Sequence, residues 1–167
     1  FQFISMSDSI SGKLFATDAS KKPGSASWPC WRGPTRDGVL EDAQFPADFS
    51  NLTQLWSCEL ADSYSGPVLN GDLVFTTETV DKKSETLVAL NKLTGDVLWK
   101  REWQGAMSVP FFAKSNGDWI RATPATDGKY LVLGGMCDVV ACFDVATGQE
   151  VWRIDFVKDH GATLPSF

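Results

Sequence analysis

Arg121 is the side chain whose type and position best suit the binding of a small charged group. It follows Gly117-Asp-Trp-Ile and stands directly before an expected strand. An arginine offers paired N–H donors in a geometry that matches a carboxylate, such as a peptide terminus. Most arginines in such places only form a salt bridge or anchor a loop, and we favour that role. Arg121 is therefore a weak candidate for ligand binding.

The single histidine and the four cysteines offer little chemistry. His160 would need partners that the sequence does not place to form a metal site or a Ser-His-Asp triad, so we expect an exposed loop imidazole. No C-x-x-C or Cys-Cys pair occurs among Cys30, Cys58, Cys137 and Cys142. We expect Cys142 to be a buried free thiol, with a disulfide to Cys137 as the alternative.

Two loops carry clustered side chains. Arg32, Arg36 and Asp37 lie in a Gly/Pro-rich loop, where we expect pairing within the loop itself. The connection 103–121 is longer than most and is lined by aromatic residues. It is either a recognition element or a cap on the edge of a sheet, and both interpretations stay open. The aromatic residues are Trp103, Phe111, Phe112 and Trp119.

An internal repeat must position these loops. The pattern Asn91, Thr94-Gly95 and Trp99 returns 53 positions later as Asp144, Thr147-Gly148 and Trp152. An Asn or Asp can close a turn on its own backbone, and the glycine can adopt a positive φ. The repeat predicts a hairpin in which Gly95, Val97 and Trp99 share one face. The tryptophan should bury a large area against a neighbouring sheet.

Each copy of the repeat predicts a four-stranded antiparallel unit. Asn70-Gly71 and Asp127-Gly128 are hairpin signals at matching positions. A separate strand over 52–60 carries Trp56 and matches a fourth strand. The strands of the first unit are expected at 67–69, 72–80, 86–90 and 97–102, and those of the second at 123–126, 129–134, 139–143 and 150–155.

Sheets repeating every 40 to 60 residues predict an all-β fold, a partial β-propeller of stacked blades. With strands running up and down, tight turns should lie on one side and the long connections 61–65, 103–121 and 157–167 on the other. We expect any binding on the side of the long connections, because loops carry function.

We divide the chain into a flexible leader, 1–27, and propeller repeats, 28–167, with blades at about 64–102 and 122–155. Two blades and one strand cannot close a ring, so we expect the N-terminal piece of a longer protein or a truncated gene product. The isolated chain should expose sheet faces and self-associate.

Composition limits the partners. The net charge is −6 and the pI about 4.7, which argues against nucleic-acid binding because phosphates require a surplus of cations. No apolar run approaches the roughly 20 residues of a membrane-spanning helix. A content of 43% hydrophobic residues is enough for a packed core.

The repeat resembles the tryptophan-docking motif of pyrroloquinoline-quinone (PQQ)-like β-propellers. Trp28-Pro-Cys-Trp-Arg-Gly-Pro-Thr-Arg-Asp-Gly38 and Gly117-Asp-Trp-Ile-Arg-Ala-Thr-Pro124 resemble the PQQ-like repeat proteins of planctomycete-type bacteria. Those proteins are similar to the outer-membrane assembly scaffold BamB and, more distantly, to quinoprotein alcohol dehydrogenases.

The resemblance implies a non-catalytic scaffold or binding module of the periplasm or cell envelope, with a protein partner. The alternative is a fragment of a PQQ-dependent dehydrogenase whose cofactor site is completed by other blades. PQQ with calcium would then be the cofactor, and Arg121 the residue facing it. The dehydrogenases typically use a vicinal disulfide and calcium ligands, and this sequence has no Cys-Cys pair. A third possibility is a sensor propeller attached to a signalling domain.

Overall fold

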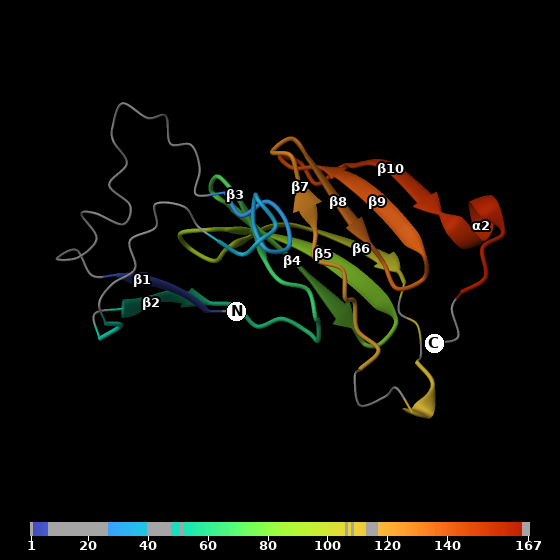
Figure 1. Ribbon diagram of the computed structural model, residues 1–167, viewed down its shortest axis with the longest axis horizontal. Coiled ribbons are helices and arrows are strands. Elements are labelled where there is room, and N and C mark those ends of the chain that lie inside the picture. Colours follow the sequence, from blue (N-terminus) through green and yellow to red (C-terminus); the bar gives the residue numbers. More distant parts are fainter. Residues whose placement is uncertain are drawn as a thin grey trace.

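The computed structural model describes residues 2–6, 27–39, 48–50, 52–105, 107, 109–112 and 117–164, with only the backbone described for 2–6. This part of the chain is all-β, apart from short helical turns, and contains two four-stranded antiparallel sheets and a two-stranded one (Figure 1). The sheets stack on one another as the blades of a partial propeller. The expected fold class is therefore confirmed.

Blade one and blade two repeat the same strand order, with the first strand at one edge and the fourth at the other. The expected bounds of most strands differ from the observed ones by at most two residues. Blade one contains β3 (Val68–Asn70), β4 (Leu73–Val80), β5 (Ser84–Asn91) and β6 (Val97–Gln104); blade two contains β7 (Ala125–Thr126), β8 (Tyr130–Gly134), β9 (Val139–Asp144) and β10 (Glu150–Asp155).

The two faces of blade one pack against different neighbours. Phe75, Leu87 and Ala89 face blade two and join its Leu131 and Phe143 in the larger hydrophobic core. The alternate positions of the same strands face the opposite way, because successive side chains of a strand point to opposite faces. They form a second core with Trp56; its buried members are Trp56, Val74, Val88 and Leu90.

Trp56 belongs to β2 (Leu52–Ser57), which is three residues shorter than expected. Strand β2 pairs with β1 (Gln2–Met6), which lies inside the segment expected to be a flexible leader. The rest of that leader, up to residue 26, lies outside the described residues.

A β-bulge in β6 turns the fourth-strand tryptophan, Trp99, toward blade two. In β6, Val97 pairs with Leu90 and Trp99 with Ala89, so Leu98 is the extra residue. The bulge places Trp99 and Val97 on opposite faces, and the expectation that they share one face was wrong. The register of β10 shifts at the same point, between Glu150 and Trp152.

Trp56 and Trp99 each pack on the glycine of the next Thr-Gly turn along the chain. A Cβ added to Gly95 would lie 2.5 Å from Cδ2 of Trp56, and one added to Gly148 would lie 2.6 Å from Cδ2 of Trp99. The Trp56 indole also donates to the Lys92 carbonyl oxygen at 2.9 Å. Each turn therefore requires glycine at this position, because φ is positive and because a side chain would clash with the indole ring.

The turns lie at two ends of the sheets, as expected. One end, here called the tight-turn face, holds the turns 71–72, 92–96, 127–129 and 145–149. It also holds the segment 27–39, which the sequence did not place there: Trp28 and Leu69 exchange backbone hydrogen bonds of 3.0 and 2.9 Å. The other end, called the long-loop face below, holds the connections that lead into the two blades, including residues 61–65 and 117–121.

Replacing Gly148 with alanine should lower the free energy of unfolding by about 2–4 kcal/mol. The left-handed conformation and the clash with Trp99 both contribute. Gly71→Ala is the matched control, because its φ is +59° but nothing lies within 4 Å of the added Cβ. Its cost should be about 1–2 kcal/mol. Chemical denaturation of both variants measures the difference, and equal losses would show that the tryptophan contact contributes nothing.

Candidate binding face

The long-loop face is assembled by hydrogen bonds between the segments that lead into the two blades. The Tyr64 N–H donates to the Ile120 carbonyl oxygen at 3.0 Å, and the Ile120 N–H donates to Thr79 Oγ1 at 2.8 Å. The Gly66 N–H donates to Thr123 Oγ1 at 3.1 Å. These bonds hold the entry to blade one against the entry to blade two.

Arg121 lies at this junction beside two aromatic rings. Its guanidinium carbon is 5.5 Å from the centre of the Tyr64 ring, and that ring is 5.1 Å from the ring of Trp119. An Arg121 Nη2–H donates to the Gly117 carbonyl oxygen at 3.1 Å. This hydrogen bond joins Arg121 to the turn at Gly117. Tyr64 is the member of the group that the sequence did not indicate.

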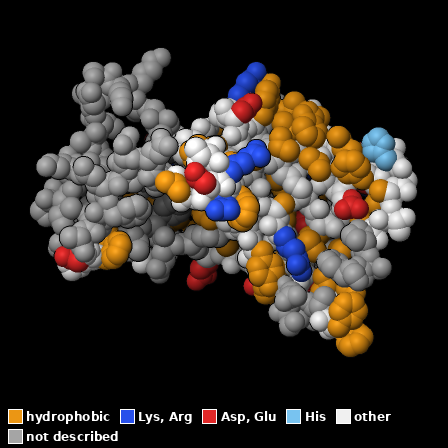
Figure 2. Space-filling view, in the orientation of Figure 1, with side chains coloured by type: hydrophobic (Ala, Val, Ile, Leu, Met, Phe, Trp, Pro, Cys, Tyr) orange, Lys and Arg blue, Asp and Glu red, His pale blue; other side chains and the backbone are white. Residues whose placement is uncertain are grey.

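Phe111 and Phe112 form the most exposed aromatic pair in the described part of the chain. Their side chains are 84% and 63% exposed, and their rings meet edge to face at 5.6 Å. They lie on a short helical turn of the connection between the blades. Figure 2 shows hydrophobic side chains gathered in this region, at the lower right of the view. Exposed aromatic residues are typical of protein interfaces.

Trp103 does not share this exposure, although the sequence grouped it with the loop. It lies in β6 and is buried, with its ring 6.1 Å from that of Phe143 in blade two. Its indole N–H donates to Glu85 Oε2 at 2.9 Å. The strand continues two residues beyond its expected end and carries Trp103 into the core.

Glu85 is a fully buried glutamate that joins the two blades. Its second carboxylate oxygen accepts a 2.8 Å hydrogen bond from the Met136 N–H of blade two. A Cβ added to Gly105 or Gly135 would lie 2.5 Å from Glu85 Oε2, so both glycines leave room for the carboxylate. Sequence reasoning missed Glu85, because a strand glutamate between polar residues resembles a solvent-facing one.

Burial raises the pKa of Glu85. The hydrogen bonds from Met136 and Trp103 and the positive charge of Arg153 oppose this rise without cancelling it. The Arg153 guanidinium lies 5.5 Å from the Trp103 ring and bonds to Glu150 on its own strand. The glutamate is therefore held at the blade junction by neutral donors rather than by a direct ion pair.

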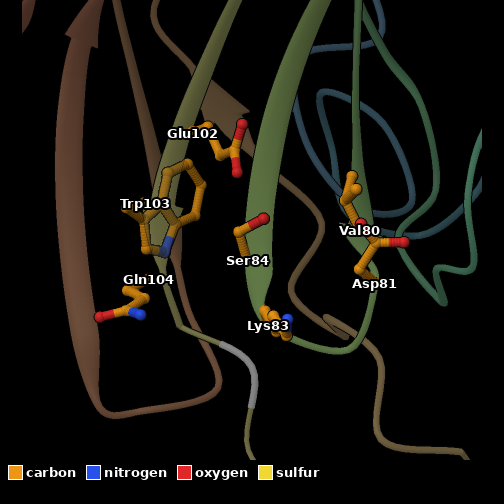
Figure 3. Close-up of a pocket in the computed structure, with 7 residues that line it drawn as sticks. All are labelled: Val80, Asp81, Lys83, Ser84, Glu102, Trp103 and Gln104. Carbon is orange, nitrogen blue, oxygen red and sulfur yellow. The ribbon is translucent and has the colours of Figure 1, made fainter.

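A shallow pocket of about 580 Å³ lies at the long-loop end of blade one, beside Trp103 (Figure 3). One wall is the aromatic ring of Trp103. The other walls carry side chains of both charges and one amide. The indole nitrogen of that wall is already bonded to Glu85. The pocket therefore offers the face of the indole ring, rather than its N–H, for contact. It is lined by Val80, Asp81, Lys83, Ser84, Glu102, Trp103 and Gln104.

The remaining sequence candidates play local roles. His160 is exposed, but it lies on the short helix α2 (Phe156–His160) rather than in a loop, beside the ring of Phe156. Cys137 and Cys142 are both free, so the disulfide alternative was wrong, and Cys142 is buried as expected. Burial raises the pKa of both thiols. No group of three His, Cys, Asp or Glu in the described ranges could hold a metal ion.

The loop of Arg32, Arg36 and Asp37 is bonded within itself, as expected, but through hydrogen bonds rather than ion pairs. An Arg32 Nη2–H donates to the Asp37 backbone carbonyl at 2.9 Å. The Asp37 carboxylate accepts instead from the Thr35 hydroxyl and from the Val39 N–H. Within the described residues no ion pair joins this carboxylate to either arginine.

Comparison with known proteins agrees with the fold. Residues 83–165, about half of the chain, match the family model described as outer membrane protein assembly factor BamB. The crystal structure of BamB from Moraxella catarrhalis is 21% identical over 60% of this chain and 26% of its own, with a TM-score of 0.44. A europium-containing methanol dehydrogenase is 18% identical over 81% of this chain and 23% of its own, with a TM-score of 0.57. None of the curated proteins compared with the chain matches it.

The stacked four-stranded sheets, the family match and the likeness to the fold of the methanol dehydrogenase identify part of a β-propeller. The match over residues 83–165 supports assignment to the PQQ-like β-propeller superfamily, which the repeat indicated. It spans about a quarter of the length of each of these two solved structures. No helix within the described residues is long and apolar enough to cross a membrane.

Protonation of Glu85 should be visible in the pH dependence of stability. Because the folded pKa is raised above the ordinary value of 4.5, the folded protein holds this proton more tightly than the unfolded chain. That stabilisation is complete below the unfolded pKa and is lost as the pH rises through the folded pKa. Relative to the parent, Glu85→Gln should therefore gain free energy of unfolding as the pH rises from about 4 toward neutrality.

Denaturant titrations at several pH values measure this difference. Glu102→Gln, on the exposed part of β6, removes the same charge outside the junction and corrects for the change in net charge. A Glu85→Gln difference that is flat with pH, or that falls, would contradict the raised pKa.

Proposed function

We propose that this chain is part of a non-catalytic PQQ-like β-propeller scaffold of the bacterial cell envelope that binds a protein partner. The main observation in support of a partner site is the exposure of two adjacent aromatic side chains. Phe111 is 84% exposed and Phe112 is 63% exposed. Two aromatic rings in contact with solvent gain free energy when a partner covers them. The match to the model described as outer membrane protein assembly factor BamB supports the cellular setting.

Other residues of the long-loop face support the same proposal. Tyr64 is half exposed and lies beside Arg121, so aromatic and guanidinium groups occur on one face. Tyrosine, tryptophan and arginine are the residues that most often dominate binding energy in protein interfaces. The hydrogen bonds around Ile120 fix the Tyr64 side of this surface before any partner arrives, which lowers the entropic cost of binding.

The alternative is a fragment of a PQQ-dependent dehydrogenase. The guanidinium of Arg121 beside Tyr64 and Trp119 suits a planar molecule that carries a carboxylate, which favours this alternative. Calcium does not fit the described residues, since no cluster of acidic ligands occurs among them. The likeness to a methanol dehydrogenase at 18% identity concerns the fold alone. We therefore place the dehydrogenase second.

Site-specific photo-crosslinking in cells tests the scaffold function. A photoreactive residue at Phe112 should yield a discrete crosslinked product with one partner, and Arg121→Ala should reduce its yield. Leu93 is the matched control, because it is 64% exposed but lies on the tight-turn face. It should give no such product. Equal products from both positions would contradict a partner site on the long-loop face.

Calorimetric titration of PQQ with calcium into the full-length protein tests the alternative. We expect no binding heat beyond dilution. Tight stoichiometric binding that is lost in Arg121→Ala would establish a cofactor site and overturn the non-catalytic function. The parent chain and the variant should be compared for thermal stability first, so that lost binding is not confused with lost folding.

A further inference from the structure

The segment of residues 31–37, here called the arginine loop, stands on a base that is fixed to both blades. Backbone hydrogen bonds join Trp28 to Leu69 of β3 in both directions. The Thr126 N–H of β7 donates to the Pro29 carbonyl oxygen at 2.8 Å. The loop therefore lies at the first-strand edges of two blades, on the tight-turn face and away from the partner site proposed above.

Internal hydrogen bonds hold the arginine loop in one conformation. The Gly33 N–H donates to the Cys30 carbonyl at 2.9 Å, and the Arg36 N–H donates to the Gly33 carbonyl at 3.1 Å. The Gly38 N–H closes the loop on the Arg32 carbonyl at 2.9 Å. A loop with these bonds loses little further entropy when a ligand binds.

Two arginines in this loop occupy backbone positions that suit glycine or asparagine better. Arg32 and Arg36 have φ values of 65° and 61°, in the left-handed region that is costly for a residue with a Cβ. Strained positions of this kind are common at functional sites, where the side chain is what matters. The Arg36 guanidinium makes no hydrogen bond or ion pair that accounts for the strain within the described residues.

The loop also presents an aromatic ring beside its charge. Trp31 is 66% exposed, and the Arg32 guanidinium carbon lies 5.5 Å from the centre of its ring. Cationic and hydrophobic side chains meet near the centre of Figure 2, where the loop lies in Figure 1. Asp37 is the acidic residue of the loop, and its carboxylate is held by Thr35 and the Val39 N–H. The loop is thus locally cationic on a chain of net charge −6.

We propose that the arginine loop binds an acidic segment of another polypeptide that also carries an apolar side chain. The guanidinium groups of Arg32 and Arg36 pair with carboxylates, and the apolar side chain packs on Trp31. A nucleic acid offers similar anionic and stacking groups, but the negative net charge of the chain repels an extended polyanion. This site lies on a different face from Phe112 and does not rest on the function proposed above.

Fluorescence anisotropy with a labelled peptide that alternates glutamate and phenylalanine tests the proposal. Arg36→Gly should weaken binding about three- to fivefold, the range of an exposed ion pair. The same change should keep or raise the melting temperature, since glycine removes the left-handed strain. Trp31→Ala should weaken binding about tenfold or more. Lys82→Gly relieves the same kind of strain at φ 56° in another turn and should leave binding unchanged.

Three outcomes would overturn the proposal. One is that the glutamate peptide does not bind the full chain, or binds no better than a peptide with lysine in place of glutamate. Another is that Arg36→Gly and Trp31→Ala both bind like the parent. The third is that a single-stranded oligonucleotide binds through Trp31 and Arg36 more tightly than the peptide, which would assign the loop to nucleic acid.

Discussion

The structure depends on the packing of a fourth-strand tryptophan against a glycine in the next blade. Trp56 lies on Gly95, and Trp99 lies on Gly148, at distances that leave no room for a methyl group. This contact requires three local features at once: a turn with a positive φ, a bulge that rotates the tryptophan, and an apolar face behind it. The repeat therefore encodes a junction between blades rather than a blade alone, and each blade is stabilised by its neighbours.

A second junction at the opposite end of the same blades is polar. There the Glu85 carboxylate accepts two hydrogen bonds, one from Trp103 of its own blade and one from Met136 of the next. Burying a carboxylate is costly, and both oxygens are satisfied, which limits that cost. Apolar packing at the tight-turn end and a buried polar bond at the long-loop end together fix the angle between the blades. The hydrogen bond from the Tyr64 N–H to the Ile120 carbonyl oxygen then holds Tyr64 beside Arg121.

The two faces therefore present separate surfaces from one framework. The long-loop face carries exposed aromatic rings on connections that the blade junction holds in place. The tight-turn face carries the arginine loop, whose base is hydrogen-bonded to the first strands of both blades. Both surfaces combine aromatic and guanidinium groups, a composition suited to protein recognition.

The sequence by itself determined the architecture, because turns, alternation and the repeat are local patterns that recur at fixed spacing. It placed nearly every blade strand within two residues, and it assigned the superfamily. Only the tertiary structure decided which side chains meet. The bulge before Trp99 depends on strand pairing, and the burial of Glu85 and Trp103 depends on contact with blade two. Such contacts join residues far apart in the chain, and no local pattern records them.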